Sequence, residues 1–173
     1  MECARLIYNL LSTERTDGAI YCTTLGYGLD ADGEIDVLAL MDKDAEVFEP
    51  LSRAYSLPKN TEEELAHKEA VLEEALLSAS LVPLDIMRKS VEALLLQEEL
   101  SHKGTRMAIS DVAVGVQFLR AALLGASMNV YINTKSMKDS AQADKLNKEA
   151  DELISKGCAL ADEIYDRIHK SLR

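Results

Sequence analysis

The chain has 173 residues, a length that suits one domain with a sizeable core, and its 47% apolar and 28% charged residues are close to the globular average. Its formal net charge of −11 makes nucleic acids and anionic membranes poor partners, because both carry negative charge themselves. The three widely spaced cysteines, Cys3, Cys22 and Cys158, exclude a disulfide-rich secreted scaffold and favour a reducing compartment.

The sequence shows no signal for export or for membrane insertion. Its N-terminus lacks the basic start and long apolar run of a signal peptide. We find no apolar stretch that approaches the ~20 residues needed to cross a bilayer, so we expect a cytoplasmic protein. Glycine and proline are scarce, at 8 and 3 residues, whereas Leu, Ala, Glu and Lys abound, and this favours helices over strands.

The N-terminal third is predicted to contain two helices. Residues 1–12 have the apolar spacing of a short helix, and residues 12–33 are expected to form an irregular connection. The next helix is predicted over residues 34–57, with Pro58 ending it. One stripe of this helix is apolar or aromatic except for a single carboxylate: Val37, Met41, Asp44, Phe48, Leu51 and Tyr55.

A third helix is predicted to begin after Asn60 or Thr61, because three glutamates follow there and complement the positive end of a helix dipole. Pro83 is expected to end or kink this helix, with a fourth helix after it. Ser110 has the character of an N-cap for a helix that reaches Tyr131 and is apolar on most sides. The inner faces of the third and fourth helices are predicted to be Leu65, Leu72, Leu76, Ala79, Met87, Val91, Leu94 and Leu95.

The last helix is predicted from about Ala141 to the C-terminus, with a heptad-like apolar stripe. Short connections between long helices imply antiparallel neighbours. The prediction is therefore one all-α domain over residues 1–173, an antiparallel bundle of about five to six helices. The stripe of the last helix is Leu146, Ala150, Leu153, Gly157, Leu160, Ile164 and Ile168.

Asp44 is the first candidate for chemistry. If its stripe is buried, desolvation raises the pKa of the carboxyl and makes it a candidate general acid or base. The alternatives are an ion pair with a lysine, a cap on a neighbouring helix end, or a position on a solvated rim. Asp42 lies about 200° around the helix from Asp44, so the two cannot form a dyad, and Asp42 is expected to be solvated.

Polar residues on the apolar helix form a second group of candidates. Asn129 and Asn133 lie one turn apart and can act together, whereas Asp111 lies about 27 Å from Asn129 along a straight helix. Hydrogen bonding between helices is the favoured alternative for the two asparagines, because buried polar groups need partners. The alternative for Asp111 is a residue that stabilises the start of the helix.

Lysines near the helix ends could meet an anionic ligand or could simply be solvated. These lysines are Lys59, Lys135 and Lys138. The three histidines and three cysteines lack the spacing of metal ligands, so no metal site is predicted. The sequence also lacks a phosphate-binding loop and a dinucleotide fingerprint.

Several segments, in order, resemble the cyclodeaminase domain of formiminotransferase-cyclodeaminase. The segments are 42–48 (DKDAEVF), 57–63 (LPKNTEE), 82–84 (VPL), 109–112 (ISDV) and 125–133 (GASMNVYIN). An ordered series of motifs is much more specific than any one of them, and the resemblance covers roughly residues 38–170.

The resemblance implies an all-helical, dimeric enzyme that closes 5-formiminotetrahydrofolate to 5,10-methenyltetrahydrofolate with loss of ammonia. Some family members act instead as methenyltetrahydrofolate cyclohydrolases. The proposed catalytic aspartate of the family falls on Asp44, which would transfer protons as folate N10 attacks the formimino carbon. A reduced folate is the implied substrate, with no other cofactor. The implied substrate-binding residues are Ser110, Asp111, Asn129, Asn133 and Lys59, of which the first two would bind the folate or its charged tail at a helix N-terminus.

The N-terminal segment departs from the family. Residues 1–36 lack the Pro-Gly-Gly-Gly-Ser-type turn and the Lys-rich segment that the family has there. Three functions therefore stay open: a cyclodeaminase, a cyclohydrolase, or a non-catalytic interaction protein that keeps the scaffold and dimerises through residues 110–134.

Overall fold

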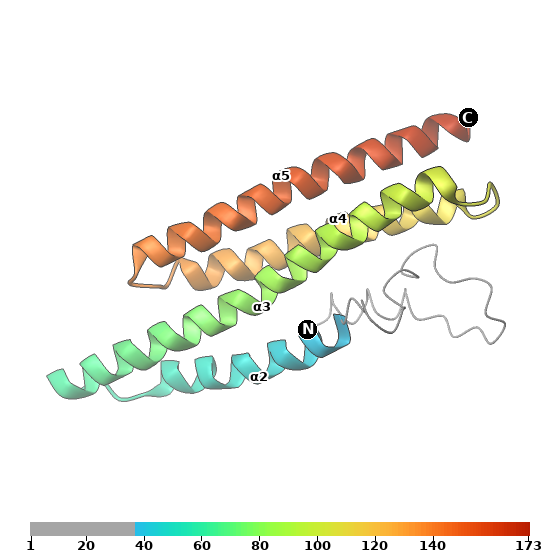
Figure 1. Ribbon diagram of the computed structural model, residues 1–173. Helices are drawn as coiled ribbons and strands as arrows, with labels where there is room; N and C mark the ends of the chain where they lie inside the picture. Colours follow the sequence, from blue (N-terminus) through green and yellow to red (C-terminus); the bar gives the residue numbers. More distant parts are fainter. Residues whose placement is uncertain (1–36) are drawn as a thin grey trace.

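The computed structural model describes residues 37–173, and this part of the chain folds into four helices without a strand (Figure 1). Each helix runs antiparallel to the one before it, so the predicted all-α antiparallel bundle is confirmed. The predicted helix over residues 1–12 and the irregular connection after it lie outside the described residues. The four helices are α2 (Val37–Ser56), α3 (Glu62–Lys103), α4 (Ile109–Thr134) and α5 (Ser140–Ser171).

Helix α3 is the axis of the molecule. Its 42 residues extend for about 63 Å. It begins where the sequence predicts, because Thr61 and Glu64 form a capping box in which each accepts a hydrogen bond from the backbone of the other. Helix α2 lies along the first half of α3, whereas α4 and α5 lie along the second half (Figure 1).

Pro83 lies inside α3, so the prediction of two separate helices at this point was wrong. A proline has no N–H, and the carbonyl four residues earlier, that of Ala79, loses its helical donor. Asn133 of α4 donates its Nδ2 hydrogen to this carbonyl over 2.9 Å. The freed carbonyl is thereby satisfied, and the helix continues through the proline.

The core consists of three apolar clusters arranged along α3. One joins α2 to the first half of α3, and the other two join α3, α4 and α5. The helices pack closely at Gly157, where an added Cβ would collide with Leu123 Cδ2 and lie 3.1 Å from Val91 Cγ2. Of the predicted inner residues of α3, Leu65 and Leu95 are exposed instead.

Helix α4 begins at Ile109 with Ala108 at its N-cap and without a side-chain cap, so the prediction of Ser110 as N-cap was wrong. The Ala108 N–H already donates to the Thr105 carbonyl over 3.0 Å, and the Asp111 N–H donates to the Ala108 carbonyl over 3.1 Å. A turn therefore leads into the helix before Ser110. Ser110 and Asp111 both lie in the first turn of α4.

Among the described helices, only α4 is long and apolar enough to cross a membrane, which corrects our expectation that no stretch approached this length. This criterion considers length and composition alone, and the central helix of a water-soluble bundle meets it as well. In the structure, 44% of the most apolar window of α4 is buried inside the molecule. Its buried face packs against both α3 and α5, as expected for a core helix.

Candidate functional site

Helix α2 packs on α3 through a face that only partly coincides with the predicted stripe. Leu51 and Ala54 are buried in this contact, whereas Phe48 and Tyr55 are 65% and 52% exposed. Asp44 is half-buried, at the edge between the buried face of α2 and its exposed face. The predicted stripe is therefore rotated toward solvent, and Asp44 lies at its inner margin. The side chains of the two remaining stripe residues, Val37 and Met41, lie outside the described residues.

Asp44 has no hydrogen bond or ion pair with any residue between 37 and 173. Within that range the alternatives of a lysine pair or a helix cap are not observed. Asp42 is exposed, as predicted. Asp44 thus differs from Asp42 in being partly withdrawn from water, and neither of its carboxylate oxygens is bonded to another residue in the range 37–173.

The register between α2 and α3 shows which part of α3 lies opposite Asp44. Lys68 Nζ on α3 donates to the carbonyls of Tyr55 over 2.7 Å and Leu57 over 2.8 Å. Because the helices are antiparallel and rise about 1.5 Å per residue, these two contacts place Asp44 at about the level of residues 79–81 of α3. The carbonyl of Ala79 is the one that Asn133 of α4 reaches. Asp44 and Asn133 therefore approach α3 at the same level, from two different helices.

Asn129 and Asn133 keep the one-turn relation predicted for them, but their environments differ. Asn133 is half-buried and uses its amide hydrogen on Ala79, so hydrogen bonding between helices, the favoured alternative, is observed. Asn129 is exposed. Asn133 therefore has a structural role at the middle of α3, and helices α2 and α4, which carry Asp44 and the two asparagines, both contact α3 but not each other.

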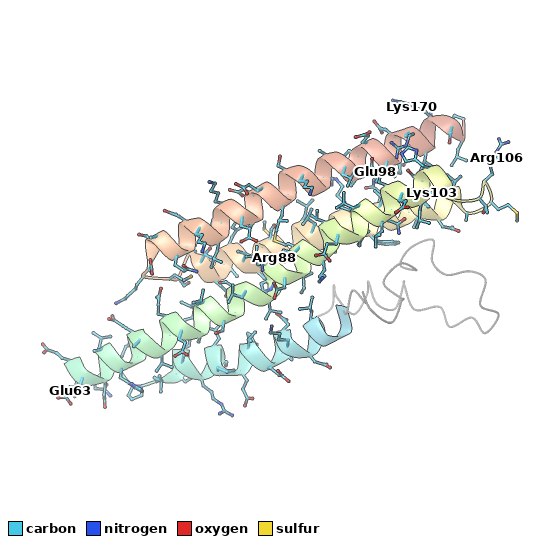
Figure 2. The ribbon with its side chains drawn as sticks, viewed as in Figure 1. Glu63, Arg88, Glu98, Lys103, Arg106 and Lys170 are labelled. Atoms are coloured by element: carbon cyan, nitrogen blue, oxygen red, sulfur yellow. The ribbon has the colours of Figure 1, made fainter. Side chains whose placement is uncertain are left out.

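The other candidates lie at the two ends of the molecule. Lys59 is exposed just before α3, whereas Ser110 and Asp111 are exposed at the start of α4, just after α3. Glu63 and Arg106, labelled in Figure 2, mark these two ends. Since α3 extends for about 63 Å, one small ligand cannot contact Lys59 and Asp111 of the same chain.

A groove that the sequence reasoning missed lies between α2 and α3. It has a volume of 330 Å³ and opens on the flank of α2 that carries Glu46, about 200° around the helix from Asp44. The signal in the sequence is Pro50, inside the predicted helix, whose missing N–H leaves the Glu46 carbonyl without its helical donor. The lining residues are Glu46, Val47, Pro50, Val71, Glu74, Ala75 and Ser78.

Polar contacts hold the α4–α5 hairpin on α3 and so position Asn129 and Asn133. The Glu73 carboxylate of α3 accepts hydrogen bonds from the backbone N–H groups of Lys138 over 2.8 Å and Asp139 over 2.9 Å. Thr134 Oγ1 of α4 donates to Asn147 Oδ1 of α5 over 2.7 Å. The end of α4 is therefore fixed from both sides.

Two ionisable groups in this region have shifted pKa values. Burial lowers the pKa of Arg88, near the middle of α3 (Figure 2), but hydrogen bonds to Glu149 and Asp85 outweigh burial and raise it overall. Burial and a hydrogen bond donated to Asp151 over 2.5 Å raise the pKa of Tyr131 to about 12. Both groups stay protonated at neutral pH and connect helices, so neither is suited to exchange protons there.

A comparison with known families decides what this scaffold is. The model of the formiminotransferase-cyclodeaminase family matches residues 31–152, a range that includes every candidate residue named above. The chain belongs to this family. The resemblance inferred from the ordered segments is therefore confirmed.

Relatives within the cyclodeaminase family are enzymes of folate metabolism. The chain is 40% identical over 125 residues to a methenyltetrahydrofolate cyclohydrolase of Methylorubrum extorquens, which covers 72% of this chain and 60% of that protein. It is 34% identical over 116 residues to the formimidoyltransferase-cyclodeaminase of Mus musculus, which covers 67% of this chain and 21% of the longer protein. The chain thus spans only part of the length of either relative.

A solved structure of the family has the same fold. The formiminotetrahydrofolate cyclodeaminase of Thermotoga maritima superposes with a TM-score of 0.69 over 99% of this chain and 82% of that one, at 19% sequence identity. At this identity the likeness concerns the fold alone. The cyclodeaminase-family match begins at residue 31, within the N-terminal segment that is predicted to depart from the family, and the departure of residues 1–36 stays a prediction.

Proposed function

We propose that the chain binds a reduced folate and converts 5-formiminotetrahydrofolate to 5,10-methenyltetrahydrofolate with release of ammonia. The observation that carries this proposal is Asp44, a half-buried carboxylate without a partner in residues 37–173, inside the segment that matches the family. A carboxylate in such a position is suited to accept and return a proton.

The formimino group is an amidine that is protonated at neutral pH, so its nitrogen already carries two hydrogens, and the reaction needs one more proton to move to it from N10 of the substrate. Folate N10 attacks the formimino carbon, a bond forms between them, and N10 becomes acidic. Asp44 takes the proton from N10 and delivers it to the formimino nitrogen, which leaves as ammonia when its bond to carbon breaks. The proton is conserved, and Asp44 returns to its ionised form, so one carboxylate acts as base and then as acid.

A cyclohydrolase is the second candidate, and the 40% identity to the Methylorubrum cyclohydrolase, against 34% to the mouse enzyme, favours it. In this reaction water adds to the methenyl carbon, the bond from that carbon to N5 breaks, and 10-formyltetrahydrofolate and a proton are released. Asp44 would accept a proton from the attacking water. Both reactions pass through a tetrahedral carbon between N5 and N10, so the same carboxylate can serve either.

The third candidate is a non-catalytic interaction protein that keeps the family scaffold. It is supported by a family match that begins only at residue 31 and by the exposed apolar face of α4. It differs from the enzymatic candidates in predicting no saturable binding of a reduced folate.

The enzymatic proposal also includes a cytoplasmic homodimer that binds neither nucleic acid nor membrane, an expectation supported by the net charge of −11.

The first test is calorimetric titration of the protein with 5-formyltetrahydrofolate, followed by turnover assays with the formimino and methenyl substrates. We expect saturable binding, and turnover of one substrate identifies the reaction. Asp44→Asn is expected to lower kcat by a factor of roughly 10²–10⁴, the usual contribution of a general acid–base group, with helicity retained.

Asp42→Asn is the matched control, because it removes the same charge two residues away on the exposed side of α2. Its kcat is expected to equal that of the wild type. Equal activity of the Asp44 and Asp42 variants would refute the role of Asp44, and the absence of folate binding would leave the interaction protein as the better description.

A further inference from the structure

The aromatic ring of Phe48 lies on the exposed surface of α2, one turn from the proposed catalytic carboxylate. Phe48 is 65% exposed in the described part of the chain, whereas Leu51 and Ala54 of the same helix are buried against α3. Exposure alone does not indicate a function, because single apolar side chains are common on protein surfaces. The position of the ring relative to Asp44 is what points to one.

Phe48 and Asp44 share one flank of α2. Their separation of four residues places Phe48 about 40° around the helix from Asp44 and about 6 Å along its axis. Helical side chains lean toward the N-terminus of their helix, so the ring leans toward the turn that carries Asp44. Val47, the other residue one turn after Asp44, packs against the core between α2 and α3 instead. A ligand at Asp44 therefore meets Phe48 next along the exposed flank.

This flank lies on the opposite side of α2 from the groove. Glu46 and Pro50 line the groove, and each lies two residues, or about 200° around the helix, from Asp44 and Phe48 respectively. A small ligand that contacts Asp44 therefore contacts Phe48 and not the groove.

The same flank of α2 is turned toward the side of α3 on which α4 packs. Val71 lines the groove, and Glu73, about 200° around α3 from it, accepts hydrogen bonds from the backbone of the hairpin between α4 and α5. The hairpin therefore lies away from the groove, on the side that the flank with Asp44 faces. Helices α2 and α4 do not contact each other, so a ligand placed at this flank can contact side chains of both.

Asp44 lies between a polar amide and an aromatic ring along the axis of α3. The contact of Asn133 with the Ala79 carbonyl places the exposed Asn129 about 6 Å further along α3, beyond the level of Asp44. Phe48 lies about 6 Å from Asp44 in the other direction. The order along α3 is therefore amide, carboxylate and ring.

A reduced folate has groups in the same order. Its pterin has several hydrogen-bond donors and acceptors, the reacting nitrogens N5 and N10 follow, and N10 is bonded directly to the ring of the p-aminobenzoyl group. An amide can pair with the pterin, and an aromatic side chain can stack on the p-aminobenzoyl ring. A proton acceptor lies about 2.6–3.2 Å from the nitrogen it serves, and stacked rings have centroids about 4.5–7 Å apart. One turn of α2 is long enough for both contacts.

We infer that Phe48 stacks on the p-aminobenzoyl ring of the reduced folate and so positions N10 at Asp44, a role that rests on the proposed function. The amide of Asn129 then faces the pterin. Because N10 is bonded directly to the ring, a contact that fixes the ring also fixes N10. Phe48 thus acts by orienting the substrate, whereas Asp44 transfers the proton.

Affinity for 5-formyltetrahydrofolate tests this role first. Phe48→Leu keeps an apolar side chain and removes the ring, and we expect it to raise the calorimetric Kd by about tenfold, the usual scale for a lost aromatic contact with its buried area. Phe48→Tyr keeps the ring and is expected to hold the Kd within about twofold of the wild type. Because Phe48 is exposed, both variants should keep the unfolding free energy of the wild type.

Tyr165→Leu is the matched control for loss of an exposed ring. Tyr165 is 37% exposed on α5, a helix that does not contact α2. Its removal is expected to leave the Kd for the folate unchanged. An equal loss of affinity in Tyr165→Leu and Phe48→Leu would overturn the inference, because the effect would not depend on the position beside Asp44.

Tryptophan fluorescence tests the contact directly, because the chain has no tryptophan. In Phe48→Trp the introduced indole is the only one, and saturation with 5-formyltetrahydrofolate is expected to lower the rate constant of its quenching by acrylamide about twofold, since the ligand covers one face of it. Tyr165→Trp carries its indole on α5 and is expected to be quenched equally with and without the folate. Equal quenching of Phe48→Trp in both states would overturn the stacking.

The outcomes separate this inference from the proposed function. A wild type that binds no reduced folate refutes both. A wild type that binds the folate, with a Phe48→Leu variant that binds it equally tightly, refutes the stacking and leaves the role of Asp44 intact. A Phe48→Tyr variant as weak as Phe48→Leu refutes the stacking as well, because the ring would then not be the group that the folate contacts.

Discussion

The inner and outer faces of α4 are both apolar, yet they differ in what they contact. Val116, Leu123 and Val130 on the inner face are fully buried against α3 and α5. Val114, Met128 and Ile132 on the outer face are more than half exposed. A helix that is apolar all round can therefore have one face buried within the described part of the chain and another face that stays exposed there. The two faces carry the same type of residue, and they differ only in whether atoms of neighbouring helices cover them.

Two glycines make this comparison testable. Gly157 faces the inner surface of α4, where an added Cβ collides with Leu123. We expect Gly157→Ala to lower the free energy of unfolding by up to about 3 kcal/mol, because the packed neighbours must shift to admit the methyl group. Urea denaturation followed by circular dichroism measures this change. Wild-type stability in this variant would show that α5 does not pack so closely on α4.

Asn133 and Pro83 test the inner face through a hydrogen bond. Asn133→Ala leaves the Ala79 carbonyl without a donor and is expected to lower the free energy of unfolding by about 1–2 kcal/mol. Pro83→Ala restores a backbone N–H at position 83, which can donate to the Ala79 carbonyl as in an uninterrupted helix. In the Pro83→Ala background, the Asn133→Ala change should therefore lower the free energy of unfolding by less than half as much.

A double-mutant cycle of these four proteins, measured by urea denaturation, gives the coupling between the two positions. Equal costs of Asn133→Ala in both backgrounds would mean that Asn133 does not substitute for the missing N–H. Asn129→Ala is the matched control, because Asn129 is exposed one turn away and is expected to change stability little.

Gly125 on the outer face should respond with the opposite sign to Gly157. Gly125→Ala is expected to raise the free energy of unfolding by roughly 0.5–1 kcal/mol, since alanine favours the helix and its Cβ would meet no atom within 4 Å. Urea denaturation followed by circular dichroism measures this change. Destabilisation would mean that position 125 is closely packed.

The sequence predicted the helices well where periodicity and caps agree. The start of α3 after Thr61 and the length of α5 follow from local signals that tertiary contacts do not oppose. Pro83 was misjudged because the donor that compensates for it, Asn133, is distant in sequence and comes from another helix. Ser110 was misjudged because a turn that begins at Thr105 already leads into α4.

The candidate site was predictable only in part. Family motifs and spacing named Asp44, Asn129 and Asn133, and the structure places these three around the middle of α3. Spacing could not show that Asn133 uses its amide on a freed carbonyl, nor that Lys59 and Asp111 lie at opposite ends of α3. Periodicity identifies the apolar face of a helix but not what covers it, and so the exposed face of α4 resembles a core face in the sequence.

The smallest effect we expect concerns Tyr131, at the margin between the inner face of α4 and α5. Burial and the hydrogen bond to Asp151 raise the pKa of Tyr131 from 10.0 to about 12, so the folded state favours the neutral phenol. This contribution to stability is complete below pH 10 and is lost as the pH rises toward 12. In Tyr131→Phe the decline of the unfolding free energy over this range should be shallower, as urea denaturation at several pH values will measure. Tyr165→Phe, which removes a hydroxyl from α5 instead, is the control, and an alkaline decline as steep in Tyr131→Phe as in the wild type would place the titrating group elsewhere.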